Sequence, residues 1–135
     1  EAVGRVNVDK MTLDGFCAER AIDHIHLLKC DAEGHDARVL FGARGLLTSG
    51  EIDVVQFEYN QRWVNARSYL KDVFDLVDGL PYRVGRVCPG YIEVFEQWHF
   101  ELERYFEANY LVVREPALEW FDARHGSFDI SNTYA

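Results

Sequence analysis

The chain has 135 residues, which is enough for one domain with a sizeable buried core. Hydrophobic residues make up 48% of it and aromatic residues 14%, a composition that excludes an intrinsically disordered chain. Its 23 acidic and 14 basic residues give a net charge of -9, and the basic residues form no patch. We therefore expect neither nucleic acid nor an anionic membrane surface as a partner.

The three cysteines form no metal-binding or disulfide pattern. Cys17 and Cys30 lie in apolar stretches, and no Cys-x-x-Cys spacing occurs, so we expect reduced, packed thiols and no metal site. No apolar run is long enough to span a bilayer, and no signal peptide pattern is found. These features favour a cytoplasmic location.

A strand, a helix and a second strand form the most informative part of the chain. Apolar residues at 25–30 predict a buried strand, and an apolar spacing of three and four predicts a helix over 36–48. Residues 52–59 predict the second strand. Since a helical crossover normally joins parallel strands, we expect strands 25–30 and 54–59 to be parallel neighbours.

Shorter elements surround this unit. Thr12 is a suitable N-cap for a helix over 13–20, and Gly50 is a suitable C-terminal cap for the crossover helix. Further strands are expected in 1–10, 82–87, 91–95 and 110–113, further helices at 66–78, 100–108 and 117–121, and a loop at 60–65. Together the elements predict a single α/β domain over residues 1–121, followed by a weakly patterned tail over 122–135.

Polar residues follow both central strands at the point where each strand ends. The first strand runs into Asp31, Glu33 and His35, and the second ends with Glu58 and Asn60. The carboxyl ends of parallel strands meet at one edge of a sheet, where α/β proteins bind their ligands. The sequence therefore predicts a polar site at this edge.

Several segments have the spacing of a known family: Thr12-Leu13-Asp14-Gly15-Phe16, Lys29-x-Asp31-x-Glu33-Gly34-His35-Asp36, Val39-Leu40-x-Gly42-Ala43 and Val55-x-Phe57-Glu58-Tyr59. Together they resemble the FkbM family of S-adenosylmethionine-dependent methyltransferases. The resemblance implies a Rossmann-like sheet, mostly parallel with an antiparallel last strand. It also implies S-adenosylmethionine as cofactor and methylation of a hydroxyl on a sugar, polyketide or other small molecule.

Two features of such enzymes are missing from this sequence. No Gly-x-Gly cluster follows an apolar strand, and no acid is placed to hold the ribose of the cofactor. The order of elements resembles only the second half of the fold, roughly strands four to seven. The cofactor-binding residues therefore stay unassigned, and we expect the chain alone to bind S-adenosylmethionine weakly or not at all.

Three residues after the first strand are candidates for catalysis. Asp31 is expected to orient or deprotonate the acceptor hydroxyl, with helix capping as the alternative. Glu33 could bind substrate or bond to backbone N–H groups. His35 could act as a base, since imidazole titrates near neutral pH, although an exposed histidine at a helix start is the commoner case.

Three further residues are candidates for binding the substrate. Lys29 is predicted to be buried and paired with Asp31 or Glu58, because a buried ammonium needs a partner. Glu58 is expected to lie beside Asp31 across the sheet, and Asn60 to line a pocket. His24 and His26, at the other end of the first strand, are assigned a structural role.

Two alternatives to a methyltransferase remain open at this stage. The first is a non-catalytic half-fold, whose exposed strand edge would form a homodimer or pair with a missing amino-terminal half. The second is metal-dependent glycosyl transfer, because Asp31-Ala32-Glu33 is similar to the Asp-x-Asp that holds a divalent cation.

Overall fold

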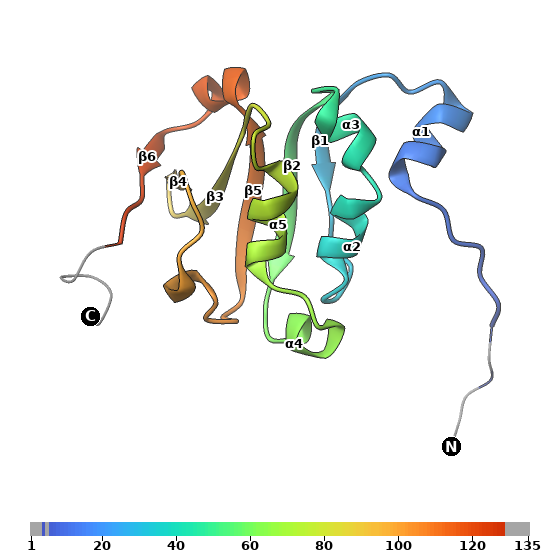
Figure 1. Ribbon diagram of the computed structural model, residues 1–135, viewed down its shortest axis with the longest axis horizontal. Coiled ribbons are helices and arrows are strands. Elements are labelled where there is room, and N and C mark those ends of the chain that lie inside the picture. The colour runs from blue at the N-terminus through green and yellow to red at the C-terminus, as the bar shows by residue number, and fades with distance from the viewer. Residues whose placement is uncertain (1–3, 5, 129–135) are drawn as a thin grey trace.

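The computed structural model describes residue 4 and residues 6–128 of the chain, and its centre is one mixed β-sheet (Figure 1). The six strands of this described part lie in the order β1-β2-β5-β3-β4-β6. Their bounds are β1 Ile25–Lys29, β2 Ile52–Tyr59, β3 Tyr82–Cys88, β4 Tyr91–Phe95, β5 Ala108–Arg114 and β6 Ala123–His125. The strands alternate with helices along the first half of the chain, as an α/β fold requires.

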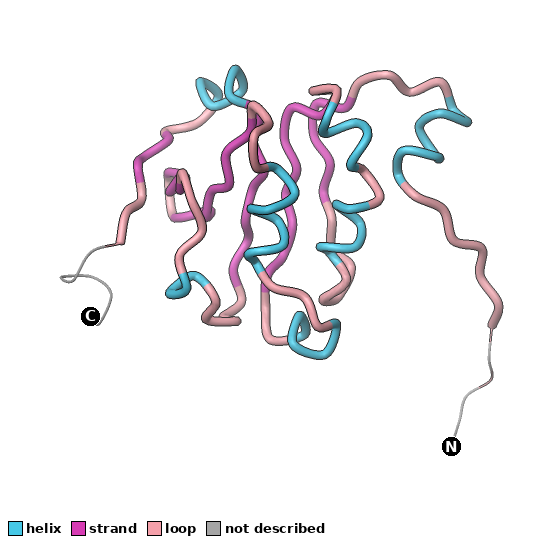
Figure 2. Tube along the Cα trace, viewed as in Figure 1, coloured by secondary structure: helices cyan, strands magenta, loops and turns pink. Residues whose placement is uncertain are grey.

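The helices are short, and several of them lie over one face of the sheet (Figure 2). The α-helices are α1 Leu13–Arg20, α2 Asp36–Phe41, α3 Arg44–Thr48, α4 Arg62–Ala66 and α5 Leu70–Val77, and the 3-10 turns are η1 Phe100–Leu102 and η2 Glu115–Trp120. Helices α2, α3 and α5 cover β1, β2 and β5, while α4 lies below the end of β2 (Figure 1). None of the helices in the described chain has the length and apolar character needed to cross a membrane.

The predicted parallel pairing of the two central strands is confirmed. Strands β1 and β2 are parallel neighbours, with Leu27 beside Val54. Strand β5 is antiparallel to both of its neighbours, β2 and β3, and β3 is also antiparallel to β4. A mostly parallel sheet was expected, but parallel pairing is limited to β1–β2 and β4–β6.

The single crossover helix predicted over 36–48 is two helices. Helix α2 ends at Phe41 and α3 begins at Arg44, because the chain turns at Gly42 beside the start of α1. The Gly42 carbonyl accepts a hydrogen bond from the backbone N–H of Asp14, at 2.9 Å. Helix α1 therefore fixes the break between α2 and α3.

The helix predicted over 66–78 begins later, at Leu70, and the predicted loop at 60–65 contains α4. Arg67 has a positive φ of 55°, which ends α4 and turns the chain before α5. The carboxylate of Glu103 accepts hydrogen bonds from the backbone N–H groups of Leu70 and Lys71, at 3.1 and 2.8 Å. These two N–H groups have no partner within a helix, so Glu103 fixes where α5 begins.

The helix predicted over 100–108 is wrong. Only the 3-10 turn η1 forms there, because the Glu103 carboxylate accepts hydrogen bonds from the start of α5 and Tyr105 adopts a positive φ of 55°.

No strand forms in residues 6–10, which are exposed coil, and Val3 lies outside the described residues. The weakly patterned stretch after residue 121 contributes β6, which pairs with β4 in parallel. Residues 129–135 of the predicted tail lie outside the described part.

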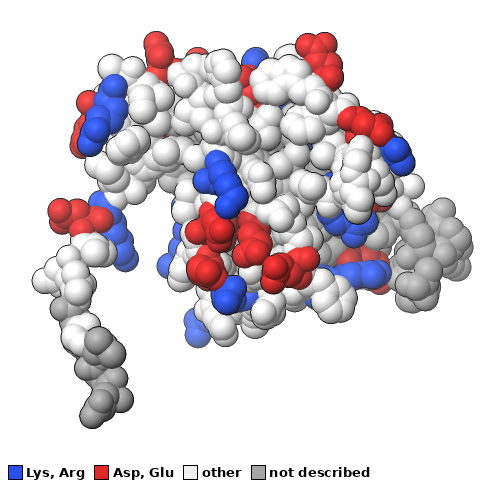
Figure 3. Space-filling model, turned by 180° about the vertical axis from the view of Figure 1, so that it is seen from behind, with Lys and Arg blue, Asp and Glu red and all other residues white. Residues whose placement is uncertain are grey.

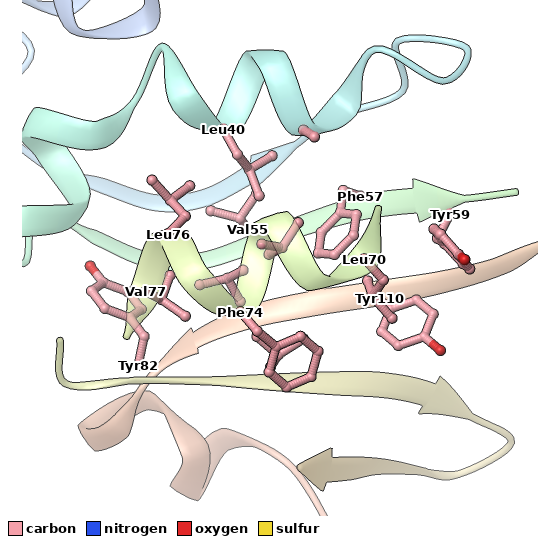
Figure 4. Packing of buried hydrophobic residues seen from close by; sticks show 14 of the residues in the cluster. Leu40, Val55, Phe57, Tyr59, Leu70, Phe74, Leu76, Val77, Tyr82 and Tyr110 are labelled. Carbon is pink, nitrogen blue, oxygen red and sulfur yellow. The ribbon is translucent and has the colours of Figure 1, made fainter. Parts of the chain in front are cut away.

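The main hydrophobic core lies between the helices and one face of the sheet (Figure 4). Alternate residues of β2 point into it, and α5 packs its apolar face against them. The labelled members of this core are Leu40, Val55, Phe57, Tyr59, Leu70, Phe74, Leu76, Val77, Tyr82 and Tyr110. Cys17 and Cys30 are buried free thiols, as predicted.

A smaller cluster covers part of the other face. Val54 of β2 packs there with residues of β4 and β5 and with Ala117 of η2. Strand β1 forms one edge of the sheet and leaves the side chain of Leu27 61% exposed. The two faces of β2 thus bury different clusters, which orients Glu58 relative to Phe57 and Tyr59.

Candidate active site

The predicted polar edge exists where β1 and β2 end, near α4 (Figure 1). Since β1 and β2 are parallel, their carboxyl ends bring the residues after each strand to the same rim. The space-filling view from behind shows acidic side chains grouped on this face, with basic side chains above and below them (Figure 3). We use the name acidic rim for Glu58 and the four carboxylates whose charges act on it, which are Asp31, Glu33, Asp36 and Glu107.

A tight turn after β1 positions the first acids of the rim. The backbone N–H of His35 donates to the carbonyl of Ala32 at 3.0 Å, and Glu33 and Gly34 between them have positive φ values of 52° and 95°. Two central residues with positive φ are the mark of a type I′ turn. A non-glycine residue rarely adopts this conformation, so Glu33 is held in a strained backbone position.

The buried side chain of Asp36 stabilises this turn by accepting hydrogen bonds from its backbone. Its side chain is fully buried, and its two carboxylate oxygens accept hydrogen bonds from the backbone N–H groups of Ala32 and Gly34, both at 3.3 Å. Gly34 is required by packing as well as by its φ, because a Cβ there would lie 2.8 Å from the carbonyl carbon of Arg62. Asp36 is therefore a structural acid, whereas the other acids of the rim face outward.

Asp31 and Lys29 form an exposed ion pair. The Lys29 ammonium lies 3.4 Å from Asp31 Oδ2, and their side chains are 62% and 54% exposed. The prediction that Lys29 is buried is wrong, because β1 is an edge strand and its outer residues meet solvent. The predicted partnership with Asp31 is confirmed.

Glu33 and His35 have different surroundings. The Glu33 carboxylate lies 2.6 Å from Nη1 of Arg62, the first residue of α4. This ion pair links the turn after β1 to α4. His35 takes the N-cap position of α2 without a side-chain hydrogen bond, and its ring has no hydrogen-bond or ion-pair partner among the described residues. Within the described chain, neither Glu33 nor His35 makes a side-chain hydrogen bond or ion pair with another predicted site residue.

Glu58 is the most enclosed of the outward-facing carboxylates. The amide nitrogen of Asn60 donates to its Oε2 at 2.8 Å, and Oδ1 of the same amide accepts from the backbone N–H of Arg62 at 2.9 Å. The indole N–H of Trp63 donates to the Glu58 carbonyl at 2.9 Å. Asn60 is fully buried, so its predicted place in a ligand pocket is instead a supporting position beneath Glu58.

The surroundings of Glu58 raise the pKa of its carboxyl group. Partial burial raises the pKa of the Glu58 carboxyl above its ordinary value, and four neighbouring carboxylates raise it further. These neighbours are, in order of effect, Glu107, Asp31, Glu33 and Asp36. The predicted proximity of Asp31 and Glu58 is consistent with this effect. A carboxyl that keeps its proton to higher pH than usual is suited to proton transfer.

Sequence reasoning missed Arg62 and Glu107 as contributors to the rim, and it missed the role of Asp36 in the turn. Asp36 was read as a helix start, Arg62 as a loop residue, and Glu107 as part of a helix. The pattern that could have revealed this role of Asp36 is a short acidic side chain two residues after Gly34, since Asp commonly bonds back to turn N–H groups. No local signal marks Glu107, because the antiparallel pairing of β5 with β2 brings it to the rim.

The parallel strands β1 and β2 place several carboxylates at the edge of the sheet where they end. In α/β proteins this edge is the usual place for binding a ligand or for catalysis, so the fold and the rim are typical of that class of protein. The family model for the methyltransferase FkbM domain matches residues 1–84, a span that includes α1, the whole crossover unit and all of the rim except Glu107. The chain therefore belongs to the FkbM methyltransferase family. No curated protein and no solved structure matches the chain.

Membership in this family implies a methyl donor, so the rim can be tested for a donor pocket. The one glycine of the rim, Gly34, has its open side filled by the backbone of Arg62, and no room for a ligand remains there. In the described part of the chain no strand is followed by a Gly-x-Gly turn. Neither Gly34 nor the end of any described strand therefore has the open glycine turn that commonly holds such a donor.

Proposed function

We propose that this chain forms the acceptor side of an S-adenosylmethionine-dependent methyltransferase that methylates a hydroxyl of a sugar or other small molecule. The observation that carries the proposal is Glu58, a partly buried carboxyl with a raised pKa at the rim of a sheet in the FkbM family. In such a reaction the acceptor oxygen would form a bond to the methyl carbon of S-adenosylmethionine while the bond from that carbon to sulfur breaks, which releases S-adenosylhomocysteine, and the acceptor hydroxyl would lose its proton. Glu58 or Asp31 would accept that proton.

The strand order supports this proposal. In β1-β2-β5-β3, strand β5 runs antiparallel between two strands of the other direction. This order resembles strands four to seven of a Rossmann-like methyltransferase sheet. On this reading, a fourth-strand acid, Asp31, and a fifth-strand acid, Glu58, face the acceptor.

The contacts of the rim favour methyl transfer over metal-dependent glycosyl transfer. Asp31 and Glu33 are each paired with a cation of the chain, Lys29 and Arg62, and they do not converge with other ligands on a common point within the described residues. A nucleoside diphosphate would meet an excess of negative charge at the rim, whereas the cationic sulfonium of S-adenosylmethionine would not.

The proposal is tested by product formation in the native protein that carries this chain. S-adenosylhomocysteine release is measured with a panel of small hydroxyl acceptors, for the wild type and for Glu58→Gln. We expect acceptor-dependent release that Glu58→Gln lowers by about 10²–10⁴. Asp75→Asn, which removes an exposed acid paired with Lys71, is the matched control and should keep full activity. Release that needs no acceptor, or equal activity of Glu58→Gln, would refute the proposal.

A second candidate function, partner binding, is favoured by the open edge of β1. Within the described residues no strand pairs with the outer side of β1, and Leu27 is exposed there. Such an edge can accept an extended segment from another chain. If this is its role, sedimentation should show a complex or dimer that Leu27→Lys abolishes.

A further inference from the structure

The side chains of two histidines and one aspartate converge where β1 and β2 begin. This end of the two strands lies opposite the acidic rim, as the ribbon shows (Figure 1). Nε2 of His24 lies 2.8 Å from Oδ2 of Asp53, and Nδ1 of His26 lies 3.7 Å from the same oxygen. The three ligand atoms all lie within 4.8 Å of one another. The parallel pairing of Leu27 with Val54 produces this convergence, since it sets the preceding residues of β1 and β2 side by side.

The central ligand of this cluster is built into the fold. The Asp53 side chain is only 5% exposed, and its other oxygen, Oδ1, accepts hydrogen bonds from Nε and Nη2 of Arg114 at 2.9 and 2.6 Å. Arg114 thus fixes the orientation of the carboxylate and leaves Oδ2 to face the two imidazoles. A buried acid in a fixed orientation is the usual anchor of a metal site.

A second carboxylate orients the first histidine. Oε2 of Glu51 lies 3.3 Å from Nδ1 of His24, on the side of the ring away from Asp53. If the Nδ1 hydrogen is directed to Glu51, the Nε2 lone pair is directed to the space beside Asp53. Metal-binding histidines have this arrangement, in which the non-ligating nitrogen donates to a carboxylate.

We propose that His24, His26 and Asp53 bind one divalent transition-metal ion, with zinc as the expected occupant. Two imidazole nitrogens and one carboxylate oxygen suit Zn²⁺ better than Mg²⁺ or Ca²⁺, which prefer oxygen ligands alone. Ligand atoms at tetrahedral zinc lie about 3.4 Å apart, because each bond is about 2.0–2.2 Å long. The contacts of 2.8 and 3.7 Å to Asp53 Oδ2 bracket that value. The His26 side chain is 80% exposed and can rotate to close the site.

The ion would join the edge strand to its neighbour. His24 and His26 belong to the β1 segment and Asp53 to β2, so a metal between them crosslinks the two strands at the end where they begin. Because the acidic rim lies at the other end of the same strands, the proposed metal does not contact the acceptor. Its role is to stabilise β1, which has a neighbour on one side only among the described strands.

The test is metal binding by the chain itself and does not require methyl transfer. Protein stripped with a chelator is titrated with Zn²⁺ by calorimetry and with Co²⁺ by visible absorption, and the melting temperature is followed with and without Zn²⁺. We expect one equivalent to bind with a Kd of about 10 μM or tighter, tetrahedral Co²⁺ absorption, and a melting temperature raised by several degrees. His26→Ala should weaken binding at least about tenfold, and so should Glu51→Gln.

His125→Ala is the matched control, because it removes an exposed histidine of β6 far from the cluster in sequence. It should bind Zn²⁺ like the wild type. His26 is so exposed that its removal should leave the metal-free melting temperature unchanged, which keeps the test valid even if His24→Ala does not fold. Failure to bind one equivalent of Zn²⁺, equal affinity of His26→Ala, or loss of binding in Asp31→Asn instead would each overturn the proposal.

Discussion

The amide of Asn60 and the carboxylate of Glu58 form a 2.8 Å hydrogen bond across two residues at the end of β2. The same amide accepts from the backbone of Arg62, which begins α4. The strand end, the carboxylate and the next helix are therefore fixed relative to one another. This relationship makes Glu58 a positioned group and not merely an exposed acid.

Glu58→Gln should lower methyl transfer without lowering stability at neutral pH. The glutamine oxygen can still accept from Asn60, while the negative charge among the rim carboxylates is removed. Because folding raises the pKa of Glu58 above its ordinary value of 4.5, the folded protein binds more protons than the unfolded chain in the interval between the two values. Stability from this group therefore falls as pH rises through that interval.

The measurement is the melting temperature of both proteins from pH 4 to pH 8. Glu58→Gln should equal or exceed the wild type at pH 7, and the wild type should regain its relative stability towards pH 4, where its carboxyl is protonated. A variant that is less stable than the wild type at pH 7 would show that the charge of Glu58 stabilises the fold.

Asp31→Asn separates catalysis from structure at the end of β1. Its ion pair with Lys29 is exposed, and such pairs contribute at most about 1 kcal/mol to folding. The substitution should therefore leave the melting temperature nearly unchanged. If Asp31 orients or deprotonates the acceptor, turnover of the native enzyme should fall by about 10²–10⁴. Turnover close to that of the wild type in a folded Asp31→Asn protein would end this assignment.

The sequence predicted the crossover unit well because its signals are local. Apolar runs mark β1 and β2, and parallel pairing follows from the helical connection between them. The order β2-β5-β3 could not be predicted in this way, because it depends on which strands meet across long stretches of chain. The predicted helix over 100–108 failed for the same reason, as Glu103 caps α5 from a distance in sequence.

The site was predicted in part. Residues Asp31, Glu33 and Glu58 could be placed at one edge from strand ends alone. The burial of Asn60 and the exposure of Lys29 could not, because they depend on which strand is an edge and on how α4 packs. Whether a carboxyl is enclosed or exposed affects its chemistry, so the sequence could identify the candidates, with Asp31 first, but could not show that Glu58 is the most enclosed of the outward-facing acids.

Asp14→Ala should destabilise the crossover. The Asp14 carboxylate of α1 accepts from the backbone N–H groups of Gly45 and Leu46 at 2.8 and 3.0 Å, so it caps α3 across the chain. Loss of such a cap lowers the free energy of unfolding by about 1–2 kcal/mol. Urea unfolding measures the change, with Glu19→Ala, an exposed acid of α1, as the control. An equal effect of the two substitutions would refute the role of Asp14 as a cap.

Gly34→Ala tests whether the turn after β1 is fixed by packing as well as by backbone conformation. Gly34 and Gly90 both have positive φ, 95° and 84°, so alanine strains the backbone at either position by about 1–2 kcal/mol. Only at Gly34 would the new Cβ meet other atoms, 2.8 Å from the Arg62 backbone, whereas nothing lies within 4 Å at Gly90. Relieving that overlap must shift α4 or the turn, which should lower the free energy of unfolding by about 1–3 kcal/mol more than Gly90→Ala does. Denaturant unfolding of both variants gives the difference directly. Equal losses would mean that the rim accommodates the extra methyl group, and Arg62 would then not fix the position of Glu33.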